Sequence, residues 1–182
     1  MIGKLRIAAL LWLLSLSAVA LAGWTDGAGK PLPDSDDRRS SGPLLAQLVL
    51  TADEPALRQQ WEHSKATPQL SITHRVEIGR AISSAIFFQG CQPDSSGQCQ
   101  LFVEFSLQGP DGKQMPAGNG MVWQKKPLAG RFMLGDTSIS LVFDNSDQPG
   151  NYYLHANILD RVSTRRLLLR PQFELLPSTK AD

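Results

Sequence analysis

Short segments in which apolar and polar residues alternate run through most of this 182-residue chain. The clearest lies at residues 101–108, where Leu101, Val103, Phe105 and Leu107 alternate with neighbours that are mostly polar. A period of two places such residues on one face of a β-strand. This segment therefore predicts a strand in a sheet that buries one face against a core and exposes the other.

The same period returns between turns that are rich in Gly, Pro and Asp. Strand-sized segments of this kind fall within residues 44–50, 70–78, 81–88, 132–143, 152–158 and 167–175. Short strands at such spacing are typical of an all-β sandwich, with a closed barrel as the alternative. We predict a mainly β protein, an antiparallel β-sandwich with one short helix before the main sheet.

The helix is expected where the period of two is interrupted. Thr51 is followed three residues later by Glu54, which is the spacing of a capping box. Leu57 and Trp61 come next, four residues apart and therefore on one helical face. The pattern predicts a helix over 54–64 in which Trp61 anchors the helix to the core.

Residues 1–22 have the three-part pattern of a secretory signal peptide. Two basic residues near the start precede an apolar run at 7–14, and the segment ends in small residues. We predict cleavage near Ala22–Gly23 and a periplasmic or secreted mature protein. The apolar run is shorter than the roughly 20 residues of a membrane span, so no stable span is expected after cleavage. A retained anchor is the alternative.

The rest of the chain divides into three parts by composition. Residues 23–43 are rich in Gly, Pro, Ser and charge and have little to bury, which predicts a flexible leader. Residues 44–177 carry the alternating segments and are expected to form a single β-sandwich domain. Residues 178–182 form a short tail.

The charge balance argues against polyanionic partners. Lys4 and Arg6 are the only charged residues of the predicted signal peptide, so removing them from the 18 basic residues leaves 16 against 17 acidic residues. A nearly neutral chain offers no electrostatic basis for binding nucleic acid or anionic lipid. We therefore expect no nucleic-acid partner.

Cys91 and Cys99 are the only two cysteines, and both follow the predicted export signal. An even count in an oxidising compartment predicts one disulfide, here one that pins a hairpin. The spacing is not Cys-x-x-Cys, which argues against a redox function. Two cysteines alone do not fill a tetrahedral zinc site. We expect neither a metal nor another cofactor.

Reactive groups are few. His63, His74 and His155 are the only histidines, and no two of them stand at metal-binding spacing. The chain has no Gly-x-Ser-x-Gly nucleophile motif and no glycine-rich phosphate loop. Glu104 is the one acid inside a strongly patterned strand, on its polar face. We predict that the protein is not an enzyme, with a hydrolase whose site is not visible in sequence as an alternative.

The best candidate for a binding site is Trp123 with Lys125 and Lys126. These residues fall in a stretch at 115–130 that is rich in Gly and Pro and is predicted to be an irregular loop. An aromatic ring beside cations suits a sugar or a partner surface. Ordinary packing at the rim of the domain is the alternative.

Four arginines gather near the last strand: Arg161, Arg165, Arg166 and Arg170. Cations on an edge strand deter sheet-to-sheet aggregation, so a solvated edge is one interpretation. A basic patch for an acidic polymer such as an anionic glycan is the other.

Residues 147–163 and 167–175 resemble the immunoglobulin-like and fibronectin type III-like domains of secreted bacterial proteins. The resemblance lies in the turn Asp147-Gln-Pro-Gly, the alternating strand from Tyr152, a further turn and the last strand. It implies a β-sandwich with Tyr152 near the tyrosine corner, where a hydroxyl bonds to the main chain. The close pair of cysteines departs from the inter-sheet disulfide of immunoglobulin domains.

A second resemblance is to small bacterial periplasmic proteins of unassigned activity. These carry a Phe-x-Gly-Cys hairpin followed by Pro-Asp-Gly, which stand here at 88–91 and 110–112. Neither resemblance supplies a function, because a fold does not imply one.

The function expected from the sequence is therefore a non-catalytic interaction or accessory module of the cell envelope. Its partner would be an envelope or secreted protein. The first alternative is a carbohydrate-binding module for envelope or extracellular glycan that uses Trp123. The second alternative is the hydrolase named above.

Overall fold

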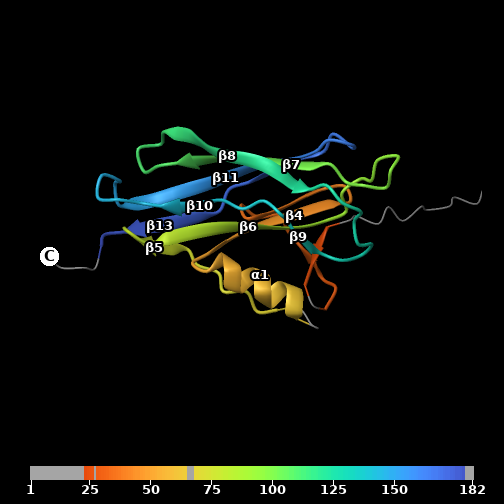
Figure 1. Cartoon of the computed structure of the whole chain (residues 1–182), viewed down its shortest axis with the longest axis horizontal. Coiled ribbons are helices and arrows are strands. Elements are labelled where there is room, and N and C mark those ends of the chain that lie inside the picture. The colour runs from red at the N-terminus through yellow and green to blue at the C-terminus, as the bar shows by residue number, and fades with distance from the viewer. Residues whose placement is uncertain (1–22, 27, 65–67, 179–182) are drawn as a thin grey trace, which may run out of the picture.

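The structure is a computed structural model that describes residues 23–26, 28–64 and 68–178. The predicted signal peptide, 1–22, and nearly all of the predicted tail lie outside the described residues. The described chain forms two stacked β-sheets, and one helix lies against the outer face of one of them (Figure 1). No helix in this part of the chain is long and apolar enough to cross a membrane.

One sheet has five strands. Its order is β10 (Ser140–Val142), β6 (Ala81–Gln89), β4 (Leu44–Thr51) and β3 (Arg38–Ser41), with β9 (Met133–Leu134) also paired to β6. All of these pairs are antiparallel. A small separate sheet joins β1 (Trp24–Thr25) to β2 (Pro31–Leu32).

The other sheet has six strands. Its order is β5 (Arg75–Glu77), β13 (Gln172–Leu176), β11 (Gly150–Asp160), β7 (Leu101–Gln108) and β8 (Gln114–Trp123), with β12 (Arg166–Leu169) also paired to β11. β12 and β13 bond to successive parts of β11 on either side of Pro171. The predicted mainly β, antiparallel sandwich is confirmed, with one parallel pair, β5 with β13.

The core lies between the inner faces of the two sheets. Leu48 and Phe88 from the five-stranded sheet and Leu154, Ile158 and Phe173 from the six-stranded sheet belong to one cluster, and each is at most 1% exposed. Burying a side chain of this size stabilises a fold by about 1.5–3 kcal/mol. β7 alternates between buried and exposed positions as its sequence predicts.

The helix α1 (Glu54–His63) covers the outer face of β4 and β6, which is why both faces of those strands are buried. Leu57 is 1% exposed, and Trp61 packs on Phe87 with 4.7 Å between ring centroids. The predicted helix and its Trp61 anchor are confirmed. The cap differs from the prediction: Asp53 accepts a hydrogen bond from the N–H of Ala56, so Asp53 and not Thr51 is the N-cap.

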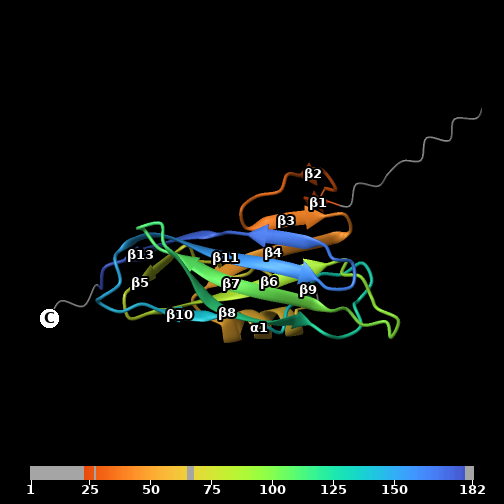
Figure 2. The same ribbon diagram turned by 90° about the horizontal axis from the view of Figure 1, so that it is seen from above.

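The segment predicted as a flexible leader, 23–43, contains three strands. β3 pairs with β4, and the carbonyl groups of Asp36 and Asp37 accept main-chain hydrogen bonds from Arg170 and Leu48. Figure 2 shows β1, β2 and β3 together at one side of the sandwich. The prediction was wrong because it counted only apolar burial, whereas main-chain hydrogen bonds hold this segment in place.

The stretch predicted as a loop, 115–130, is also different in the structure. β8 runs through Gln114–Trp123 and pairs with β7 along its whole length. Gly120 lies so close to Thr137 that a Cβ would stand 2.8 Å from the Thr137 hydroxyl oxygen. Here glycine marks a close approach between segments and not an irregular loop.

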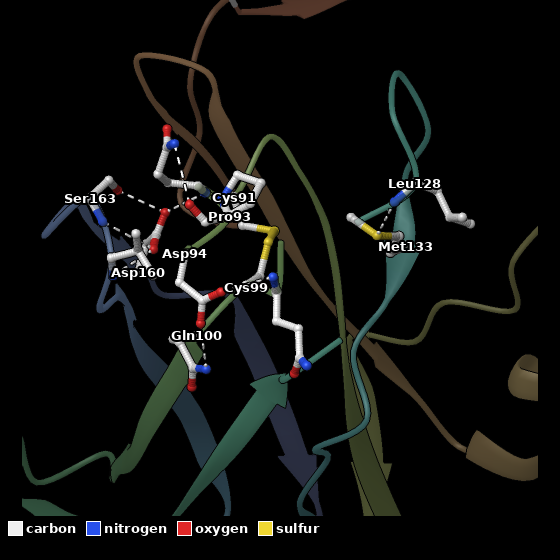
Figure 3. Close-up of a disulfide and its surroundings, with 12 residues drawn as sticks. Cys91, Pro93, Asp94, Cys99, Gln100, Leu128, Met133, Asp160 and Ser163 are labelled. Carbon is white, nitrogen blue, oxygen red and sulfur yellow. Dashed lines mark hydrogen bonds between the residues drawn. A yellow bond between two sulfur atoms is a disulfide. The ribbon is translucent and has the colours of Figure 1, made fainter. Parts of the chain in front are cut away.

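The Cys91–Cys99 disulfide is confirmed, with 6.0 Å between the Cα atoms and both residues buried (Figure 3). The bridged loop is joined to the segment just after β8, because the N–H of Cys99 donates to the carbonyl of Lys125 at 3.0 Å. A structural disulfide is typical of proteins that fold in an oxidising compartment outside the cytoplasm.

Tyr152 makes the contact expected of a tyrosine corner. Its hydroxyl donates to the carbonyl of Gln148 at 2.9 Å, and its ring stacks on Phe173. Burial raises the pKa of the hydroxyl, with Asp147 and Asp111 nearby contributing. The wider resemblance to immunoglobulin-like and fibronectin type III-like domains stays a prediction.

Candidate functional site

A groove of about 960 Å³ lies where α1, the start of β9, the end of β8 and the β1–β2 hairpin meet. Trp24, Trp61 and Trp123 all line it, together with Phe87 and Phe132. These are the three tryptophans of the described chain, and they come from three different elements. We call this site the aromatic groove.

Trp123 occupies the last position of β8 and is half-buried. Its ring meets Phe88 of the core edge-on, with 5.6 Å between centroids. The ammonium of Lys125 lies 4.8 Å from the Trp123 ring centroid and also pairs with Asp136 at 3.0 Å. The core therefore fixes one side of this ring, and a cation that is itself held in place lies against it.

Trp61 reaches the groove from α1. The helical period places it above Leu57, and this positions the ring over Phe87 of β6. Trp61 is half-buried, so it anchors the helix and also lines the groove.

Trp24 closes the groove from the N-terminal side. It stacks on Phe132 with 5.2 Å between centroids and 20° between the ring planes. Its indole N–H donates to the carbonyl of Arg39 at 3.3 Å, and the guanidinium of Arg38 lies 5.7 Å from its ring. Sequence reasoning missed Trp24 because it placed this residue in a flexible leader. A tryptophan in an otherwise polar segment was the available signal.

Charged and amide groups surround the rings. Arg58 is held by Glu54 and by the carbonyl of Gly135 at 3.0 Å. Gln47 donates its amide N–H to Asp37 at 3.1 Å. Glu62, Arg131 and Asp136 also line the groove. Within the described residues Arg131 has no ion-pair partner.

The predicted binding residues separate in the structure. Trp123 and Lys125 line the aromatic groove, but Lys126 does not. Lys126 lies beside the disulfide loop, where a Cβ on Gly97 would stand 3.7 Å from its side chain.

The three histidines lie in different places. His63 is at the end of α1, His74 precedes β5 and His155 is in the middle of β11. Their ring nitrogens are hydrogen-bonded to the carbonyls of Gln59 and Gln172 and to the side chain of Gln108, respectively. No group of three His, Cys, Asp or Glu among the described residues is placed to hold a metal ion.

Glu104 lies on the exposed outer face of β7, as its position in the alternation predicts. Its carboxylate accepts a hydrogen bond from the amide of Asn157 at 3.4 Å. This places Glu104 on the outer face of the six-stranded sheet, whereas the aromatic groove is lined from the five-stranded sheet, α1 and the end of β8.

No protein-family model matches the sequence, and no curated protein matches it. Solved structures with weak similarity include a family 123 glycoside hydrolase from Clostridium perfringens, with a TM-score of 0.43, 11% identity, and 75% of this chain and 28% of that chain covered. A β-glucosidase from Listeria innocua has a TM-score of 0.40 and 8% identity, with 96% and 21% covered.

The superoxide reductase (neelaredoxin) from Ignicoccus hospitalis has a TM-score of 0.33 and 13% identity, with 64% and 89% covered. This chain spans less than a third of either glycosidase. At such scores the similarities assign neither a family nor a function.

Proposed function

We propose that this chain is an exported, non-catalytic binding protein whose aromatic groove binds a glycan. The observation that carries the proposal is the convergence of Trp24, Trp61 and Trp123 on one groove with charged groups around it. Three large flat rings in one groove offer a large area for contact with a ligand, and aromatic residues contribute much of the binding energy at contact sites.

The chemistry of the groove matches that of a sugar chain. A pyranose ring presents C–H groups on its faces and hydroxyl groups around its rim. The indole rings suit the faces, while Arg58, Lys125 and Asp136 offer donors and acceptors to the hydroxyl groups. The groove volume, about 960 Å³, is large enough for a ligand of several sugar units.

A protein segment is the second candidate ligand. Tryptophan and arginine are the residues most enriched at the energetic centres of protein interfaces, and both line this groove. This candidate corresponds to the protein-interaction module predicted from the sequence.

The three tryptophans provide the assay. The fourth tryptophan, Trp12, lies in the predicted signal peptide, so the tryptophan fluorescence of the mature protein arises from the groove alone. The mature protein is titrated with soluble β-glucan, xylan and muropeptides. We expect at least one of them to shift the emission, and we expect the same probe to retard the protein in affinity electrophoresis.

Substitution at the groove then tests the site. Trp61→Ala and Trp123→Ala are each expected to weaken binding about 10- to 30-fold, which corresponds to roughly 1.4–2 kcal/mol. Trp123→Phe, which keeps a ring, should lose less. Val142→Ala removes an exposed apolar side chain from β10, outside the groove, and is the control.

Three results would count against the proposal. If no glycan shifts the fluorescence and a captured envelope protein does, the ligand is a protein segment. If both tryptophan variants bind as well as wild type while remaining folded, the groove is not the site. If reducing sugar is released, the protein is a hydrolase and the non-catalytic assignment is wrong.

A further inference from the structure

The outer face of the six-stranded sheet carries a second hollow, of about 720 Å³. It lies over β7, β8, β11 and β12, on the side of the sandwich opposite α1 (Figure 1). The strand register places Asn119, Glu104, Asn157 and Leu168 side by side in one row across four strands. We call this surface the polar sheet face.

Neutral hydrogen-bonding groups fill the middle of the polar sheet face. Besides the bond from Asn157 to Glu104, His155 shares a hydrogen bond of 3.1 Å with the side chain of Gln108. The amide of Gln114 donates to the hydroxyl of Ser106. Each of these side chains is at least partly exposed, so each keeps donors or acceptors for a ligand.

Arginines border this polar centre. Arg166 lines the hollow and is exposed, and the register places it one row from Glu104. The guanidinium of Arg161 lies 4.3 Å from the ring centroid of Phe102. The strand register places Phe102 in the same row as Arg166. Neither arginine has a carboxylate partner among the residues that the structure describes.

A third cation, Arg170, lies over the Tyr153 ring at 4.8 Å and 3.5 Å from Asp36. The one acid that lines the hollow is Glu104. The local charge is therefore positive, although the whole protein is close to neutral.

We propose that the polar sheet face is a second binding site, which takes a polysaccharide that carries carboxylate groups. Arginine binds carboxylates with paired hydrogen bonds, and amide and hydroxyl side chains suit the sugar hydroxyl groups between them. The rings on this face are covered by guanidinium groups, so the site binds by charge and hydrogen bonds and not by stacking. The proposal does not depend on the aromatic groove.

The test uses the mature protein and polygalacturonate as the carboxylated probe. Dextran is the neutral comparison, and polyglutamate is an acidic polymer without sugar. We expect polygalacturonate to bind, dextran not to bind, and the affinity to fall as salt is raised, because the arginines are exposed.

Charge variants make the test specific to this face. Replacing both Arg161 and Arg166 by Ala should weaken polygalacturonate binding about tenfold, because the double variant lacks two exposed cations. Glu104→Gln removes the one acid of the hollow and should strengthen binding about twofold to fivefold. Arg80→Ala removes an exposed arginine that lines neither hollow and is the matched control, with a change below about twofold.

Each remaining result would overturn the proposal. Equal losses from Arg80→Ala and from the Arg161/Arg166 double substitution would show that overall charge attracts the polymer and that this face is not a specific site. No gain from Glu104→Gln would place the ligand elsewhere. Equal binding of polyglutamate would mean that the face takes an acidic polypeptide. Loss of polygalacturonate binding in Trp61→Ala would assign that ligand to the groove.

Discussion

Replacing Asp160 with Asn is expected to destabilise the domain strongly, although Asp160 lies in neither binding surface. The side chain is 0% exposed at the end of β11. One carboxylate oxygen accepts from the N–H groups of Val162 and Ser163, at 3.1 and 3.3 Å. The other accepts from the N–H of Gln92 at 2.8 Å and from the Ser163 hydroxyl at 2.7 Å (Figure 3). Asp160 therefore ties the disulfide loop to the turn between β11 and β12.

The magnitude follows from those four hydrogen bonds. Asn keeps one acceptor oxygen, and its NH₂ group would face two donors. A hydrogen bond to a charged group contributes about 1.5–3 kcal/mol. Part of this is recovered because Gln92 is exposed, so water can replace the carboxylate as the acceptor for its N–H. We therefore expect a loss of about 2–4 kcal/mol from a folding free energy that is typically about 5–15 kcal/mol.

Urea unfolding of the oxidised protein measures this loss, followed by circular dichroism. Asp144→Asn is the control, since Asp144 likewise accepts from the N–H and the hydroxyl of a nearby serine, Ser146, but is exposed. We expect that control to cost less than about 1 kcal/mol. Equal losses of stability in the two variants, or a loss of less than about 1 kcal/mol in Asp160→Asn, would refute this reasoning. Either result would mean that burial does not increase the contribution of the Asp160 carboxylate to the free energy of unfolding.

Two further predictions concern the disulfide loop and the turns. Hydrogen bonds, chiefly from the Ser96 hydroxyl, lower the pKa of the Asp94 carboxyl group from 3.8 to about 2. The Asp94 carboxylate therefore stabilises the fold above pH 3.8, and this stabilisation is lost as the pH falls towards 2. The melting temperatures of wild type and Asp94→Asn should therefore differ at pH 5 and converge near pH 2, and a constant difference would contradict this. Gly90→Ala should cost more than about 2 kcal/mol, because its φ is +77° and a Cβ would stand 1.8 Å from the carbonyl oxygen of Pro43. Gly112→Ala has the same φ sign but open space, and it should cost clearly less in the same urea measurement.

Sequence alone predicted the features that are encoded locally. The alternation at 101–108 identified a half-buried strand, the spacing of Leu57 and Trp61 identified a helix, and the two cysteines identified a disulfide. In each case the information lies within about ten residues, so no knowledge of distant contacts was needed.

The candidate site could be predicted only in part. Trp123 was identified, but its partnership with Trp24 and Trp61 was not, because a hairpin, a helix and a strand end meet there only in the folded chain. The glycines of β8 were misinterpreted for a similar reason. At Gly120 the absent side chain makes room for Thr137, and a single sequence does not show that neighbour.

The parallel pairing of β5 with β13 has a consequence for how the protein is made. Arg75, near the middle of the chain, pairs with Glu174 in the last strand, and Val76 is buried there against the core. Pairings between such distant residues slow folding, because the intervening chain must be ordered first. A ribosome releases the chain from its N-terminus, so β13, the partner of β5, emerges long after β5 itself. The six-stranded sheet can therefore be completed only after β13 has emerged, and until then β5 is an unpaired strand that is prone to aggregate.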